Sequence, residues 1–219
     1  KMPSKTLPEW LKYLEKSHPV EMEFGLDRIS KVAKLLQLPT NGHQLDSSLD
    51  QQDCVNNTEE LTIATKVITI GGTNGKGSCV AVLDSILREA GYRVGCYTSP
   101  HLIKFNERIT INGQHSSDLD ICLAFEEINK ARKSISLSFF EFTTLAALLI
   151  MSNSNLDIAI LEVGLGGRLD AVNLIDPQLS IITGVALDHQ QWLGSDLDSI
   201  AREKAAIGRP GIVMLYGDT

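Results

Sequence analysis

The chain has 219 residues, of which 43% are hydrophobic and 21% are charged, the balance of an ordinary soluble globular protein. Its net charge of −7 argues against a general nucleic-acid binder, because phosphate backbones are bound by clustered Lys and Arg. Anionic small ligands stay possible, because a local loop can bind them on a negative protein. No apolar run reaches the ~18–20 residues that a membrane span needs, and we see no secretory signal. We therefore expect neither nucleic acid nor a membrane as a partner.

The cysteines are spaced without any C-x-x-C pair, so they suggest neither a zinc site nor a redox motif. They are Cys54, Cys79, Cys96 and Cys122. Reduced thiols in the cytoplasm are the simplest interpretation.

The first part of the chain is predicted to be helical. Apolar residues fall at helical spacing through residues 7–38, with a break near His18 and Pro19, and Pro39 ends the pattern. We expect residues 1–39 to form a helical segment that packs on the following domain. Residues 40–62 are polar and lack periodicity, which predicts a long exposed loop insertion.

Residues 63–219 alternate between short β-branched apolar runs and helical patterns, which predicts a mostly parallel α/β sheet with helices on both faces. The expected strands are 66–70, 92–98, 109–111, 156–163, 179–186 and 211–216. The expected helices are 78–90, 118–133, 139–151 and 196–207, the last with Ser195 as its N-cap. Ligands of such sheets bind at the carboxyl ends of the strands, so the residues that follow each strand are the candidates for function.

A glycine-rich loop follows the first expected strand and leads into a helix. It consists of Gly72, Thr73, Asn74, Gly75, Lys76, Gly77 and Ser78. Glycines let backbone amides curl around an anion, the helix start adds unpaired N–H groups, and a lysine can reach phosphates. The spacing is shorter than in the general P-loop pattern, and a glycine rather than a hydroxyl residue follows the lysine. The alternative interpretation is a plain strand-to-helix turn.

Polar side chains also follow the other strands. Ser99 could ligate magnesium, or belong to a simple turn. Glu162 ends a buried strand, where a carboxylate is costly without a metal or partner, and the alternative is an ion pair with Arg168. His189 lies just after a strand, at the end where ligands bind, and this position favours a metal or phosphate role over a structural one. By spacing alone, Lys204 belongs to a solvated helix face.

Several motifs occur together in the order found in one family. They are FGLDRI, GGTNGKGS, YTSPHL, FFEFTTLAAL, LEVGLGGRLDAVN, ALDHQQWLG and REKAAIGRPG. In this respect the chain resembles bacterial dihydrofolate synthase/folylpolyglutamate synthase, of the Mur ligase superfamily. The resemblance covers residues 10–38 and 66–211 and implies a P-loop-type Mur ligase ATPase domain. Residues 40–62 lie outside it.

The resemblance implies ATP and Mg²⁺ as cofactors and a set of site residues. Lys76 would hold ATP phosphates, Ser99 and Glu162 would ligate one magnesium ion, and Glu162 and His189 would serve a second. Lys204 corresponds to a lysine that family members carry carbamylated, which replaces the interpretation as a solvated residue. The positions that line the pocket for the pterin-bearing substrate are Met22, Phe24, Phe140, Asp170 and Ala171. The chain departs from the family pattern at Ser138 and Val172, where Thr is commoner. These departures bear on the substrate preference and not on the class of reaction.

The implied activity is ATP-dependent addition of L-glutamate to dihydropteroate and to folates through an acyl phosphate. We expect a monomer whose partners are these small molecules. Family members continue past the equivalent of residue 219 into a carboxy-terminal domain, so we expect this chain to be a fragment that is inactive alone. The alternatives are a monofunctional folylpolyglutamate synthase, a peptidoglycan ligase, and a non-catalytic nucleotide-binding module that uses the loop as a switch.

Overall fold

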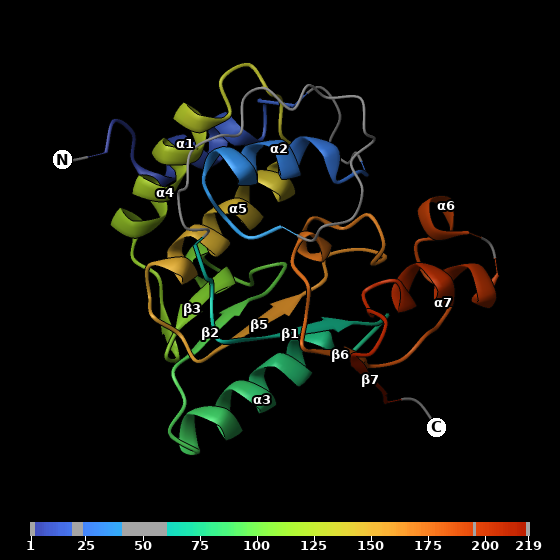
Figure 1. Ribbon diagram of the computed structural model, residues 1–219. Coiled ribbons are helices and arrows are strands. Elements are labelled where there is room, and N and C mark those ends of the chain that lie inside the picture. The colour runs from blue at the N-terminus through green and yellow to red at the C-terminus, as the bar shows by residue number, and fades with distance from the viewer. Residues whose placement is uncertain (1–2, 19–23, 41–60, 195, 218–219) are drawn as a thin grey trace.

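The computed structural model describes residues 3–18, 24–40, 61–194 and 196–217, and its centre is one seven-stranded sheet (Figure 1). The strand order is β4-β3-β2-β5-β1-β6-β7. The strands are β1 (Lys66–Gly71), β2 (Val94–Tyr97), β3 (Ile109–Ile111), β4 (Gln114–His115), β5 (Ile158–Glu162), β6 (Leu179–Ile182) and β7 (Val213–Tyr216). Among the strand pairs of these ranges, β2–β3 and β3–β4 are antiparallel and the others are parallel, so the predicted mostly parallel sheet is confirmed.

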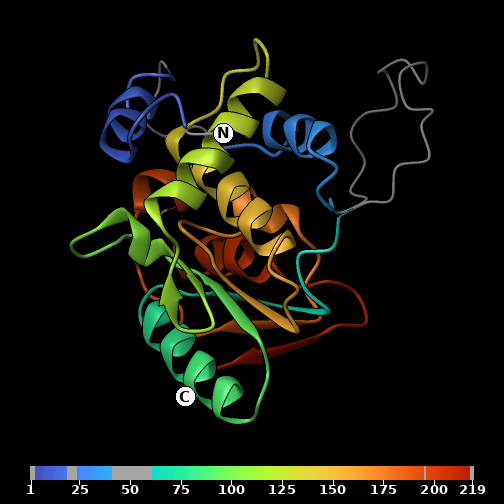
Figure 2. The same cartoon turned by 90° about the vertical axis from the view of Figure 1, so that its left-hand side faces the viewer.

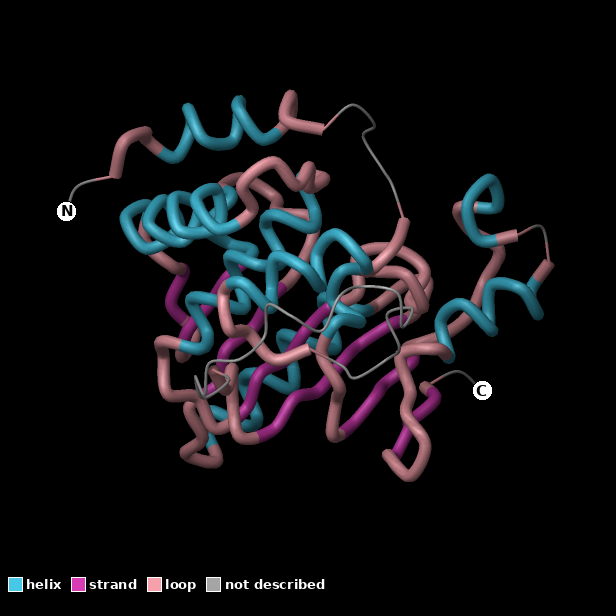
Figure 3. The backbone as a smooth tube through the Cα atoms, turned by 45° about the horizontal axis from the view of Figure 1, so that its top comes forward, coloured by secondary structure: helices cyan, strands magenta, loops and turns pink. Residues whose placement is uncertain are grey.

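Helices cover both faces of the sheet, as the sequence predicts (Figures 1 and 2). One face carries α3 (Lys76–Glu89). The other carries α4 (Asp118–Ala131) and α5 (Phe139–Ser152), with α1 (Leu7–Leu14) and α2 (Asp27–Leu35) packed over them. The short α6 (Gln190–Leu193) and α7 (Leu197–Ala205) lie together to one side of the sheet (Figure 3).

The larger core joins the amino-terminal helices to the sheet. Trp10 of α1 is 1% exposed, and its ring packs edge-on against Phe125 of α4 and obliquely against Phe142 of α5. The same apolar cluster continues to β5 through Leu161. A smaller cluster lies under α3, around Ile70 and Cys96. The amino-terminal helices are therefore held to the rest of the chain by a continuous apolar core.

The register of the central strands brings their carboxyl ends together. Ile70 of β1 lies opposite Glu162 of β5, and Gly71 lies opposite Ile182 of β6. The chain turns into the glycine-rich loop directly after Gly71. Segments that are distant in sequence thus meet at one edge of the sheet.

Several predicted boundaries are wrong by a few residues. The helix after the glycine-rich loop begins at Lys76 rather than Ser78, and β2 begins at Val94 rather than at residue 92. The last helix has Asp196 as its N-cap, with the Asp196 carboxylate accepting from the backbone N–H of Ser199, instead of the predicted Ser195. Aspartate caps a helix as well as serine does, so spacing alone could not decide between them.

Some short elements were not predicted. They are β4, α6 and the 3₁₀ turns Phe105–Arg108 and Ala171–Leu174. Asn112 and Gly113 both have positive φ, as a two-residue turn between the antiparallel strands β3 and β4 requires. Within the described part of the chain, no helix has both the length and the apolar character that crossing a membrane requires. Most of the predicted 40–62 insertion lies outside the described residues.

Candidate active site

The glycine-rich loop, residues Gly72–Ser78, has the geometry of an anion cradle. Gly75 is the N-cap of α3 with φ +82°, and the first helical N–H to be paired is that of Cys79, which donates to the carbonyl of Gly75. The preceding N–H groups at the start of this 14-residue helix lack intrahelical acceptors and lie at the positive end of its dipole. The ammonium of Lys76 folds back over the loop and donates to the carbonyls of Gly72 (3.0 Å) and Thr73 (3.3 Å).

The segment after β6 holds the loop in this shape. Thr183 donates its hydroxyl to the carbonyl of Asn74 (2.6 Å), and Gly184 accepts from the N–H of Thr73 (2.9 Å). Gly72 has φ +137°, and a methyl group there would lie 2.0 Å from Thr183 Oγ1. Only glycine fits at this contact. The predicted strand 179–186 is therefore shorter than expected, because its last residues bond to the loop instead of extending the sheet.

Glu162 and Ser99 meet beside this loop. The backbone N–H of Ser99 donates to Glu162 Oε2 (3.0 Å), and a methyl group at Gly77 would lie 3.8 Å from Glu162 Oε1. The Glu162 side chain is buried, which raises the pKa of its carboxyl, while the Ser99 N–H and the charge of Lys76 act in the opposite direction. Arg168 pairs with Glu203 (2.9 Å), so the alternative of a Glu162–Arg168 ion pair is wrong.

Lys204 of α7 also contacts the glycine-rich loop. It is 4% exposed, and its ammonium donates to the carbonyl of Gly72 (3.1 Å), so the solvated-face interpretation is wrong. Burial lowers the pKa of Lys204, the nearby Lys76 lowers it further, and Asp188 raises it. The structure therefore places two lysine ammonium groups on one carbonyl.

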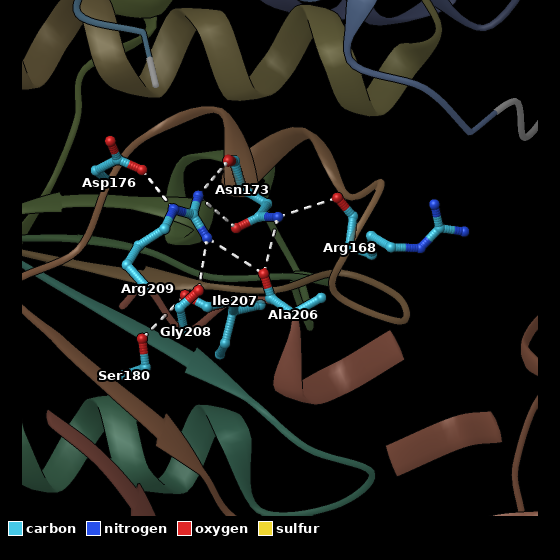
Figure 4. Close-up of polar contacts among 8 residues, drawn as sticks. All are labelled: Arg168, Asn173, Asp176, Ser180, Ala206, Ile207, Gly208 and Arg209. Carbon is cyan, nitrogen blue, oxygen red and sulfur yellow. Dashed lines mark hydrogen bonds and ion pairs between the residues drawn. The ribbon is translucent and has the colours of Figure 1, made fainter. Parts of the chain in front are cut away.

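The position of α7 is fixed by Arg209, which follows it (Figure 4). The Arg209 guanidinium donates to the backbone carbonyls of Asn173, Ala206 and Gly208 and to the side-chain oxygen of Asn173, and it pairs with Asp176. Ser180 of β6 donates to the carbonyl of Ile207. These bonds tie the end of α7 to the sheet and so hold Lys204 over the loop.

His189 is less closely tied to this cluster. It is exposed, has φ +46°, and its Nε2 lies 3.5 Å from Oδ2 of the neighbouring Asp188. Asp188 in turn is near enough to act on the pKa of Lys204. Within the described ranges, no group of three or more His, Cys, Asp or Glu side chains is arranged to hold a metal ion by itself. The metal roles of Ser99, Glu162 and His189 therefore stay predictions.

An apolar cavity of about 470 Å³ opens next to Ser99. Its wall includes the predicted residues Phe24, Phe140, Asp170 and Ala171, and Met22 lies outside the described residues. A methyl group at Gly164 would lie 2.6 Å from the Phe140 ring, so the glycine lets this ring lie directly on the backbone.

Asp170 is the buried acid of this cavity. Its carboxylate accepts from the N–H groups of Leu165 and Val172, both at 2.9 Å. Burial nevertheless raises the pKa of Asp170 to about 6. Both the neutral and the charged form of this carboxyl are therefore populated near pH 6.

Sequence patterns missed several residues that shape the site. Thr183 braces the loop, Arg108 lines the cavity, Arg209 fixes α7, and Trp192 packs against Phe24 with ring centroids 5.6 Å apart. Each acts on a segment distant in sequence, so no local spacing marks it.

The class is defined by a mostly parallel sheet in which β1 leads through a glycine-rich loop into a helix that begins with Lys76. This is a P-loop-type ATPase domain of the Mur ligase kind. The chain belongs to the dihydrofolate synthase/folylpolyglutamate synthase family. The Escherichia coli member is 44% identical over 210 residues, which are 94% of this chain and 44% of that protein. The folylpolyglutamate synthase of Lacticaseibacillus casei is 36% identical over 160 residues, which are 70% of this chain and 37% of that protein.

Solved structures agree with this assignment. Escherichia coli FolC in complex with DHPP and ADP has a TM-score of 0.87 and 41% identity over 100% of this chain and 47% of that chain. The Yersinia pestis folylpolyglutamate synthase/dihydrofolate synthase complexed with AMPPNP and Mn ion has a TM-score of 0.84 and 42% identity over 99% of this chain and 48% of that one. No protein-family model matches the chain. The chain spans less than half the length of these relatives.

Proposed function

We propose that this chain supplies the ATP-binding and acyl-substrate-binding parts of a ligase that adds L-glutamate to dihydropteroate and to folates. The observation that carries the proposal is the position of Ser99. Its N–H binds Glu162 at the phosphate loop, and the same residue lines the apolar cavity. A phosphate donor bound at the loop and an acid bound in the cavity would therefore meet at Ser99 and Glu162.

The proposed reaction begins with phosphoryl transfer from ATP to the carboxylate of the pterin-bearing acid. Lys76 and the N–H groups that begin α3 would hold the phosphates and offset the charge on the transferred group. The amino group of glutamate then attacks the acyl phosphate and displaces phosphate. The protein contributes positioning and electrostatics rather than covalent chemistry.

The residues at the loop fit a magnesium ion of the kind that accompanies ATP. Mg²⁺ is commonly held by one or two carboxylates together with substrate phosphates, so a complete protein cage is not needed. Glu162, with Ser99 and His189, would hold it, and when bound it would neutralise phosphate charge. Lys204 is proposed as the carbamylated lysine. The lowered pKa of Lys204 supports this, because carbamylation requires the neutral amine.

Pterin binding is assigned to Phe24, Phe140, Asp170 and Ala171, with Met22 added from the family pattern. The apolar wall and the buried acid support this assignment, because a flat heterocycle with N–H donors needs both. We further propose a monomer that binds these small molecules. The free cysteines Cys79, Cys96 and Cys122 support a reducing compartment such as the cytoplasm.

The test is ligation by the intact protein with ATP, Mg²⁺, L-glutamate and either dihydropteroate or tetrahydrofolate. We expect phosphate release that requires all of them, and transfer of ¹⁸O from a labelled carboxylate to phosphate. Glu162→Gln should lower the rate ~10²–10³-fold, while Glu89→Gln, on the exposed end of α3, should not. Activity with tetrahydrofolate alone would indicate a monofunctional enzyme. Tight ATP binding without ligation, and indifference to Lys204→Ala, would indicate a non-catalytic module.

A further inference from the structure

Arg108 is a buried cation in the wall of the apolar cavity that the proposed reaction does not use. It ends the 3₁₀ turn Phe105–Arg108 and is 9% exposed. Its Cζ lies 5.5 Å from the ring centroid of Phe105 and 5.6 Å from that of Phe139. The guanidinium is thus packed against aromatic rings while it lines a cavity that opens beside Ser99.

The guanidinium has no anionic partner among the described residues. No carboxylate of the described ranges forms an ion pair with it, and its one side-chain hydrogen bond there runs from Nε to His101 Nδ1 (2.9 Å). Contacts with aromatic rings offset only part of the desolvation of a cation. A buried charge of this kind is costly unless something pairs with it.

The surroundings fix the direction of the guanidinium. Because Arg108 Nε donates to His101 Nδ1, the neutral form of that imidazole carries its proton on Nε2. The loop that carries His101 is itself held by Glu107, whose carboxylate accepts from the N–H groups of Leu102, Ile103 and Lys104. Because Nε already donates to His101 and the aromatic rings lie against the guanidinium, the two terminal nitrogens remain as a pair of donors for another group.

We propose that Arg108 binds a carboxylate of a substrate in this cavity, as a bidentate pair. The planar guanidinium matches a carboxylate in shape, because two of its N–H groups can donate to the two oxygens in parallel. Asp170 lies in the wall of the same cavity and carries an acidic group in place of a basic one. The carboxylate belongs either to the pterin-bearing acid or to the incoming glutamate. The inference rests on the proposed function, because that function places the pterin-bearing acid in this cavity and brings glutamate to its carboxyl group.

The experiment compares wild type and Arg108→Gln of the intact protein, with a non-hydrolysable ATP analogue and Mg²⁺ present. The probes are pteroate and its neutral carboxamide, titrated by calorimetry, and the KM for L-glutamate is measured separately with ATP. Lys104→Gln is the matched control, because it removes one charge from the same loop at an exposed position. Circular dichroism checks that each variant is folded.

If the pterin-bearing acid is the partner, Arg108→Gln should weaken pteroate binding ~10–100-fold and leave carboxamide binding nearly unchanged. If glutamate is the partner, pteroate binding should persist while the KM for glutamate rises by a similar factor. Equal weakening of pteroate and carboxamide, or no change in any of these quantities, would overturn the proposal and leave the proposed function standing.

Two further outcomes are decisive. A wild-type protein that binds neither pteroate nor its carboxamide would refute the proposed function, and this inference with it. If Arg108→Gln does not fold, crystals of the wild-type protein with pteroate and L-glutamate decide instead. A substrate carboxylate within hydrogen-bonding distance of the Arg108 terminal nitrogens supports the proposal, and carboxylates bound only elsewhere contradict it.

Discussion

Replacing Asp170 by asparagine should remove a pH-dependent contribution to the free energy of unfolding. Asp170 is 5% exposed, and burial raises its pKa from 3.8 to about 6. Below about pH 4 the carboxyl is neutral in both the folded and the unfolded state. Between about pH 4 and pH 6 the unfolded state is ionised while the folded state keeps its proton, so stability falls as pH rises.

The size of the effect follows from the shift in pKa. A rise of about two units corresponds to about 3 kcal/mol of stability lost by pH 7, at about 1.4 kcal/mol per unit. A carboxamide cannot ionise, so the Asp170→Asn variant should lack this slope. The amide loses one of the two backbone N–H contacts, from Leu165 or Val172, which costs a constant amount at every pH.

Urea unfolding of wild type and Asp170→Asn from about pH 4 to about pH 7 tests this, with the difference between the two curves as the measured quantity. The difference cancels the other titrating groups, including Glu162. We expect the stability of the variant relative to wild type to improve by about 3 kcal/mol across this range. A constant difference would mean that Asp170 keeps its ordinary pKa and that the argument from burial is wrong.

Three further substitutions test the apolar core, the glycine-rich loop and the contacts that hold α7. Trp10→Ala should lower the free energy of unfolding in urea by about 3–5 kcal/mol, because the buried indole joins α1 to α4 and α5. A loss under about 1 kcal/mol would contradict that packing. Gly72→Ala should abolish ATP binding in a calorimetric titration, because its methyl would collide with Thr183, whereas Gly91→Ala, also at positive φ but in open space, should leave binding intact. Equal effects of the two would exclude the steric explanation. Arg209→Lys should lower the free energy of unfolding by about 1–3 kcal/mol in thermal or urea unfolding, because the hydrogen bonds of the guanidinium are lost. The control Arg202→Lys, at an exposed position, should change the free energy of unfolding little. Equal costs would mean that Arg209 does not fix α7.

Sequence reasoning brought the glycine-rich loop, Ser99 and Glu162 together because parallel strands impose a simple rule. Lys76, Ser99 and Glu162 each follow a different strand, and such strands end at the same edge of the sheet. The apolar runs that identified β1 and β5 are continuous because both faces of these strands are buried. Local pattern and tertiary structure agree at these positions.

The parts that sequence reasoning missed depend on contacts between distant segments. Thr183 is bonded to a loop that lies far earlier in the chain, and that bonding ends β6 early. Lys204 has the spacing of a solvated helix residue, yet α7 is drawn against the loop by contacts that begin at Arg209. The exposure of His189 and its positive φ could not be read from its place after a strand.

The hydrogen bonds of Thr183 have a consequence for how strongly the proposed nucleotide site would bind its ligand. A loop that already has its binding shape does not have to be ordered when a ligand arrives, so less conformational entropy is lost on binding. Here Thr183, which directly follows β6, holds the loop in shape by donating its hydroxyl to the carbonyls of Gly71 and Asn74. The affinity of the proposed phosphate site would thus depend partly on a hydroxyl group outside the loop.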